Sequence, residues 1–121
     1  MDGDVRYFKL HNTGGFVARI IVHYKEKYKS PAGIISYDAE WKNWESPNYS
    51  DICASSERTV DLKNDVNLKS GTLVKLRAYV MAGTDREAGE QYTYDEDSGK
   101  TAAYEISGTT LTSKLHKVSY I

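Results

Sequence analysis

A turn followed by a long β-branched run, over residues 12–24, constrains the fold more than any other stretch of the chain. Gly14 and Gly15 follow Asn12 and Thr13, and glycines adopt positive φ without a Cβ clash. After the glycines, every second residue is apolar or aromatic. This face consists of Phe16, Ala18, Ile20, Val22 and Tyr24. We expect a strand whose apolar face lies inward, paired as a hairpin with a strand over residues 5–10.

The same two-residue alternation recurs along the chain, and it predicts the fold class. Further strands are expected at residues 34–37, 57–62, 72–82, 90–95, 102–108 and 110–120. No stretch of a dozen residues has sustained helical periodicity. About seven to nine short strands separated by turns are typical of an all-β, single antiparallel sandwich, jelly-roll-like or immunoglobulin-like. At 121 residues the chain has the length of one domain, which we place at 1–121.

Inward faces follow from the alternation, and the polar segments between the strands are expected to be loops. Val74, Leu76, Ala78 and Val80 are expected to face inward as well, and Ala102, Tyr104 and Ile106 share one face of a later strand. Residues 25–30 are rich in lysine and polar, so a solvated loop or edge is expected there.

Charge and cysteine content exclude several function classes. The formal net charge is −1, from 16 basic and 17 acidic residues that are interspersed, which argues against a nucleic-acid partner. Cys53 is the only cysteine, so an intramolecular disulfide is impossible. We expect no cofactor.

The start of the chain does not read as an export signal. Residues 1–4 bring neither a basic region nor an apolar one, so the chain as it stands shows no signal peptide. No apolar stretch approaches the length of a membrane span. The expected location is cytoplasmic as synthesised, with release to the outside as the alternative.

Aromatic residues give the best local indication of a binding site. Trp41, Trp44 and Tyr49 lie in a polar segment, and a spacing of three prevents both tryptophans from sharing one face of a flat strand. A tryptophan on a loop stacks on a sugar ring or sits at a lipid headgroup. The alternative is that one tryptophan packs into the core of the sandwich and the other covers the open end of the sandwich. Tyr92 and Tyr94, which share a face, are added to the candidate ligand-binding residues.

Motifs for metal binding and catalysis are incomplete. Residues 95–99 resemble the start of a calcium loop, but Lys100 and Ile106 occupy the sixth and twelfth positions, where an EF-hand needs Gly and Glu. A turn between two strands is the simpler interpretation. No serine-hydrolase, zinc-protease or phosphate-loop motif occurs. Cys53 would need a histidine brought to it by folding, so we predict that the protein is not an enzyme.

Three short segments carry a resemblance to a known family. They are Asn12 with residues 14–19, residues 60–62, and Tyr104 with residues 108–111. Together they resemble a small all-β domain of nematode proteins up-regulated when insulin signalling is reduced, and of related bacterial and fungal secreted or toxin-associated proteins. Thr112 and Ala103 stand where that family commonly has proline and cysteine. The resemblance implies a stress, defence or cytolysin-like context and transfers no site residues.

These observations favour a non-enzymatic recognition module. Its expected target is a membrane lipid, a glycan or a protein surface. One alternative is a structural or assembly protein that forms homo-oligomers through its edge strands. The other is an enzyme with a cryptic site.

Overall fold

The computed structural model describes residues 2–121 as a nearly all-β protein. The described part contains twelve strands and one short 3-10 helix. The elements are β1 (Asp4–Val5), β2 (Tyr7–Asn12), β3 (Ala18–Lys25), β4 (Lys27–Lys29), β5 (Ile35–Tyr37), β6 (Lys42–Glu45), η1 (Asn48–Ser50), β7 (Glu57–Asp61), β8 (Leu73–Val80), β9 (Arg86–Glu87), β10 (Tyr92–Tyr94), β11 (Thr101–Ser107) and β12 (Lys114–Tyr120).

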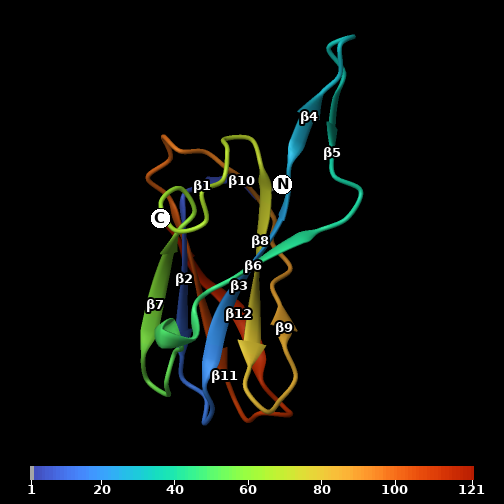
Figure 1. The fold of residues 1–121 in the computed structure, drawn as a ribbon. Coiled ribbons are helices and arrows are strands. Elements are labelled where there is room, and N and C mark those ends of the chain that lie inside the picture. Colours follow the sequence, from blue (N-terminus) through green and yellow to red (C-terminus); the bar gives the residue numbers. More distant parts are fainter. Residues whose placement is uncertain (1) are drawn as a thin grey trace.

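Two packed sheets confirm the predicted sandwich. The first sheet has the order β1-β10-β8-β3-β6, with β9 paired to β8, and the second has the order β12-β11-β2-β7. Most neighbours are antiparallel, but β1 with β10 and β2 with β11 are parallel. The strands β4 and β5 form a separate two-stranded ribbon that projects from one end of the sandwich (Figure 1). We call this ribbon, residues 27–37, the arm.

The core consists of the inward faces that alternation predicted. Phe16, just before β3, and the apolar face of β3 from Ala18 to Val22 are buried, and Tyr24 packs against them near the end of the strand. The predicted faces of β8 and β11 are buried as well. Residues with 1% exposure or less on these faces include Ala18, Ile20, Val22, Val74, Leu76, Ala78, Val80, Ala102, Tyr104 and Ile106. Apolar burial of this extent is the main stabilising contribution in such a domain.

The predicted hairpin between residues 5–10 and 16–24 is wrong. β2 pairs with β11 and β7, whereas β3 pairs with β8 and β6 in the opposite sheet. The turn between them therefore carries the chain across the sandwich. The alternation predicts which face of each strand is buried, but it does not determine which strand lies beside it.

Asn12 holds this crossing together from a fully buried position. Its Nδ2 donates hydrogen bonds to the carbonyl oxygens of Phe16 at 2.6 Å and Ile52 at 3.0 Å. Its Oδ1 accepts one from the backbone N–H of Gly14 at 2.9 Å. One amide thus satisfies buried backbone groups in two loops that are far apart in sequence.

Gly14 is needed for space rather than for positive φ. Neither Gly14 nor Gly15 is among the residues with positive φ. A Cβ atom on Gly14 would lie 2.3 Å from the ring of Phe16, which is closer than van der Waals contact allows. The prediction that Gly14 and Gly15 adopt positive φ is therefore wrong.

The predicted loop over residues 25–30 is mostly strand. β3 continues to Lys25, and β4 pairs with β5 in register from Lys27 opposite Tyr37 to Lys29 opposite Ile35. Every residue of these two strands is exposed. The absence of an apolar face explains why residues 25–30 carried no inward-facing strand pattern.

We predict that Asn12→Ala lowers the free energy of unfolding by about 2–4 kcal/mol, because it leaves the buried Gly14 N–H and Phe16 carbonyl without this partner and removes one of the two hydrogen bonds to the Ile52 carbonyl. Chemical denaturation measures the change. Asn43→Ala, at an exposed position of β6, is the matched control and should change stability by less than about 0.5 kcal/mol. A similar small loss in both variants would show that Asn12 does not organise the crossing.

Candidate functional site

The structure brings two of the predicted aromatic residues together. Trp44 lies in β6 opposite Val22, so its side chain turns toward the core, and it is half-buried there. Tyr49 lies in η1 and is 83% exposed. Both line one hollow of about 440 Å³ beside β7, together with Arg58 and Asn64. This hollow, which we call the Trp44 hollow, combines ring faces with polar groups.

Trp41 lies apart from Trp44, as the spacing of three required. Its ring is contacted by the ammonium groups of Lys25 at 5.0 Å and Lys75 at 4.3 Å from the ring centroid. These lysines alternate with the buried residues of β3 and β8, so they lie on the outer face of the sheet. Trp41 thus takes part in two cation–π contacts on this outer face.

The structure places Tyr92 and Tyr94, two of the candidate ligand-binding residues, in the interior of the sandwich. Both have 0% exposure, because Tyr92 pairs with inward-facing Val74. The Tyr92 hydroxyl lies 3.0 Å from that of Tyr104, which donates to Glu90 at 2.9 Å. Burial raises the pKa of Tyr92 and of Tyr104. These rings therefore belong to the core.

Four loops at the end of the sandwich opposite the arm form a surface that no pattern in the sequence had indicated. They are residues 13–17, 53–56, 81–84 and 107–113, and we call them the loop end. Backbone hydrogen bonds join them: Gly15 N–H to Gly108 O, Met81 N–H to Val17 O, and Thr84 N–H to Thr110 O. Asn12 ties the first loop to Ile52, just before the second.

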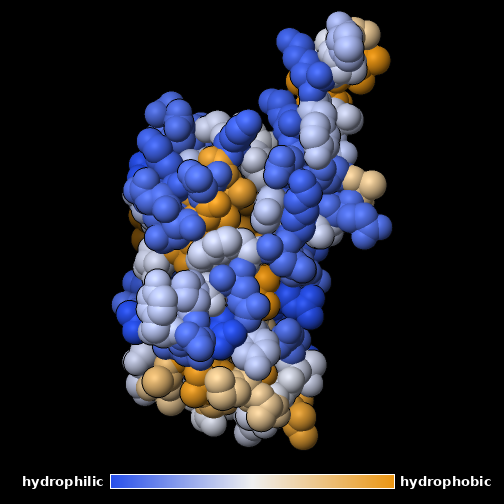
Figure 2. Space-filling view, viewed as in Figure 1, coloured by the Kyte–Doolittle hydropathy of each residue, from blue (hydrophilic) through white to orange (hydrophobic). Residues whose placement is uncertain are grey.

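The loop end has no charged residue in any of its four ranges. It exposes Leu111 at 70% and Met81 at 41%, with Cys53 and Ala82 also exposed. Figure 2 shows this end as pale and orange, below a belt of hydrophilic residues. The absence of charged residues from these ranges, in a chain with 27% charged residues, distinguishes the loop end from the hydrophilic belt beside it. Each loop alone reads as an ordinary turn, so only the fold reveals it.

Close packing fixes the shape of the loop end. A Cβ atom on Gly83 would lie 2.2 Å from the carbonyl oxygen of Thr110. Arg86 lies at the inner border and donates to Leu111 O at 3.2 Å and Ser113 Oγ at 3.0 Å. The guanidinium thus holds the backbone of Leu111, which is more exposed than Met81. The apolar side chains are presented by a hydrogen-bonded framework.

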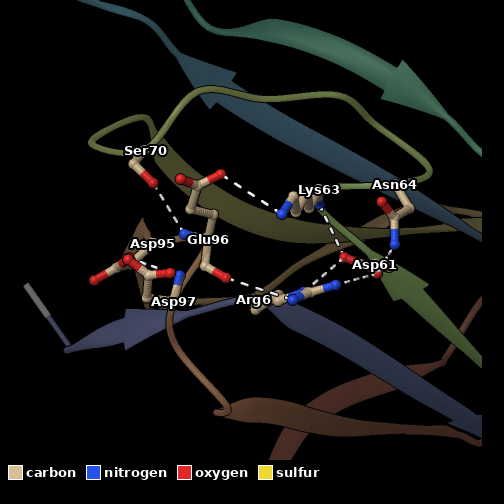
Figure 3. Close-up of polar contacts among 8 residues, drawn as sticks. All are labelled: Arg6, Asp61, Lys63, Asn64, Ser70, Asp95, Glu96 and Asp97. Carbon is tan, nitrogen blue, oxygen red and sulfur yellow. Dashed lines mark hydrogen bonds and ion pairs between the residues drawn. The ribbon is translucent and has the colours of Figure 1, made fainter.

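Carboxylates at the other end serve structural roles. Asp61 accepts a bidentate hydrogen bond from Arg6 at 3.0 and 3.1 Å, which lowers the pKa of Asp61 (Figure 3). Asp95 Oδ1 accepts from the backbone N–H of Asp97 at 2.9 Å and closes the turn there. Across residues 2–121, no group of three metal-ligating side chains comes together. Residues 95–99 thus lie in a turn between β10 and β11.

Two histidines, buried His23 and exposed His116, each lie within ion-pair distance of a carboxylate. His23 Nδ1 lies 3.2 Å from Glu87, which also pairs with Lys75 at 3.1 Å. His116 is exposed and lies 3.9 Å from Glu105. Burial lowers the pKa of His23, with Glu87 acting in the opposite direction. These contacts give no nucleophile a base, and Cys53 is exposed at the loop end.

Comparison of the fold finds toxins among the similar solved structures. A "Gram negative toxin" matches with a TM-score of 0.50 and 19% identity, covering 93% of this chain and 22% of that one. The membrane-binding domain of pneumolysin matches with a TM-score of 0.47 and 20% identity, covering 94% of this chain and 96% of that domain. Suilysin, a cytotoxin from Streptococcus suis, gives 0.45 and 18%, covering 94% of this chain and 23% of that one.

The likeness shows the fold: this chain is a β-sandwich of the kind found in a toxin. It spans less than a quarter of the length of the complete toxins that it matches. No protein-family model matches the sequence, and no curated protein does. Within residues 2–121, none of the helices has the length and apolar character to cross a bilayer. The resemblance to the nematode domain stays a prediction.

We predict that His23 makes the protein less stable as the pH falls below about 6.5, the ordinary histidine value. Because folding lowers the pKa of His23, the unfolded chain binds its proton first, and acid therefore favours unfolding. Denaturation midpoints at pH 7.5 and 5.5 measure the loss, which His23→Gln should reduce. His116→Gln is the exposed control. Equal pH dependence in wild type and His23→Gln would contradict the assignment.

Proposed function

We propose that the protein is a non-enzymatic module that binds the surface of a lipid membrane through its loop end. One observation carries the proposal: the joined ranges 13–17, 53–56, 81–84 and 107–113 expose Leu111 and Met81 and hold no charged residue, while the carboxylates that border them in the same loops, Asp51 and Asp85, form ion pairs with Arg19 and Arg77. Entry of a surface into the interfacial region of a bilayer gains free energy from apolar side chains and loses it from charges. The loop end exposes apolar side chains, and its four ranges hold no charged ones.

The expected affinity of one copy is modest. Full burial of a Leu or Met side chain contributes about 1.5–3 kcal/mol, and the loop end offers two large exposed ones. Such a gain suits reversible attachment. Tight binding would require several linked copies, or a longer protein that carries this domain beside others.

A toxin or defence context, with action outside the producing cell, is the biological setting that we propose. The motifs that resemble secreted and toxin-associated proteins include residues 108–111, which lie in the loop end. The pneumolysin domain is named for membrane binding, which agrees with the proposal. The proposal itself rests on the exposed apolar residues of this chain.

We predict that Leu111→Asp lowers binding to neutral phosphatidylcholine vesicles at least about tenfold, because the variant loses an apolar contact and must desolvate a charge. Vesicle co-sedimentation measures the binding. Ile34→Asp is the matched control, because Ile34 is exposed at 67% but lies on the arm. Equal weakening in both variants, or in neither, would contradict a site at the loop end.

A second candidate function is glycan binding at the Trp44 hollow. The observation that favours it is the exposed ring of Tyr49 beside half-buried Trp44, with Arg58 and Asn64 to hydrogen-bond to hydroxyl groups. Trp41 lies on another face and would not contribute. Aromatic rings stack on the apolar faces of sugars while polar side chains reach their edges.

We predict that Tyr49→Ala abolishes retention on any glycan-array spot that holds the wild type, while vesicle binding stays unchanged. Tyr37→Ala, an exposed tyrosine on the arm, is the control for loss of a ring. Retention by Tyr49→Ala equal to that of wild type would remove this candidate.

Assembly through edge strands remains the alternative. The edges β6, β7 and β12 each carry charged residues, among them Lys42, Glu57 and Lys114. Charges on an edge disfavour pairing with another copy. Sedimentation over a wide concentration range distinguishes a monomer from such an assembly.

A further inference from the structure

We propose a second binding site at the base of the arm, for a small molecule that joins one anionic group, a phosphate or a carboxylate, to a flat apolar body. The site is a cavity of about 420 Å³ between the arm and the segment that joins β7 to β8. A volume of this size suits a small ligand. Neither the loop end nor the Trp44 hollow contributes to it.

The apolar part of the cavity comes from three side chains that rest on the core. Tyr24, at the end of β3, and Val66 and Leu68, between β7 and β8, line the cavity. Each is half-buried and packs against the hydrophobic core. Their remaining exposed surface therefore faces a hollow with fixed walls, and Tyr28 of the arm adds a second ring.

Positive charge surrounds this apolar surface. Lys27, Lys29 and Lys69 line the cavity, and among the described residues no carboxylate forms an ion pair with them. The one acidic side chain of the lining, Glu26, already pairs with Lys42 at 3.3 Å. Three ammonium groups without an ion-pair partner in the described chain, against one carboxylate in the lining, raise the local concentration of anions.

The side chain of Lys27 lies close to the turn at Gly71. A Cβ atom on Gly71, whose φ is +98°, would lie 3.2 Å from Lys27 Cδ and 3.3 Å from its Nζ. The side chain of Lys27 thus lies against the turn, and its ammonium group reaches across from the arm to the segment before β8. An anion held there would bridge the arm and the sandwich.

The site lies at the end of the molecule opposite the loop end (Figure 1). When the loop end is in contact with a bilayer, the cavity faces away from it. Its ligand is therefore expected to come from solution rather than from the same membrane. The inference does not depend on membrane binding, and its test uses the protein without vesicles.

The test is a nuclear magnetic resonance titration of the ¹⁵N-labelled chain with phenyl phosphate, inorganic phosphate and benzyl alcohol. Phenyl phosphate should shift the backbone signals of residues 24–29 and 66–72 before others. Inorganic phosphate and benzyl alcohol should each bind at least about fivefold more weakly, because each supplies half of the recognised chemistry. The double variant Lys27→Gln, Lys69→Gln should lose about tenfold in affinity for phenyl phosphate.

The matched control is the double variant Lys114→Gln, Lys117→Gln, which removes two exposed lysines from β12. All four lysines are exposed, so none of the variants disturbs the core, and unshifted signals elsewhere will verify folding. Shifts spread over many lysine-bearing surfaces, equal losses in both double variants, or inorganic phosphate binding as tightly as phenyl phosphate would each overturn the proposal.

Discussion

The buried amide of Asn12 is the interaction on which the arrangement of the molecule depends. It binds the carbonyls of Phe16 and Ile52 and the N–H of Gly14 where the chain passes from one sheet to the other. Without Asn12, buried backbone groups would lose a hydrogen-bond partner, and this costs more free energy of folding than the loss of a contact at the surface. The crossing places the first loop beside the other three, so the loop end exists because β2 and β3 are in different sheets.

Sequence alternation was sufficient for the faces but not for the neighbours. The inward residues of β3, β8 and β11 could be predicted because a strand repeats every two residues. The partner of β2 could not, because nothing local distinguishes a hairpin turn from a crossing whose buried asparagine bonds to residue 52. Tyr92 and Tyr94 were grouped correctly on one face, but tyrosine suits both core and surface. The loop end was invisible because its four loops are separated by whole strands.

The two ends of the molecule differ in chemistry, and the sandwich keeps them apart. The four ranges of the loop end hold no charged residue and expose Leu111 and Met81, whereas the arm end carries lysines around a cavity. Long strands such as β3 and β8 run between the two ends (Figure 1). The membrane contact that we propose would therefore leave the arm end in solution.

The most direct measurement uses Cys53, the single cysteine of the chain, which is exposed in the loop end. An environment-sensitive fluorophore attached there reports the polarity around the loops when phosphatidylcholine vesicles are added. The account predicts a blue-shifted, brighter emission that lipid-embedded quenchers reduce. An unchanged spectrum under conditions in which the labelled protein co-sediments with the vesicles would contradict it, because the protein would then be attached by another surface.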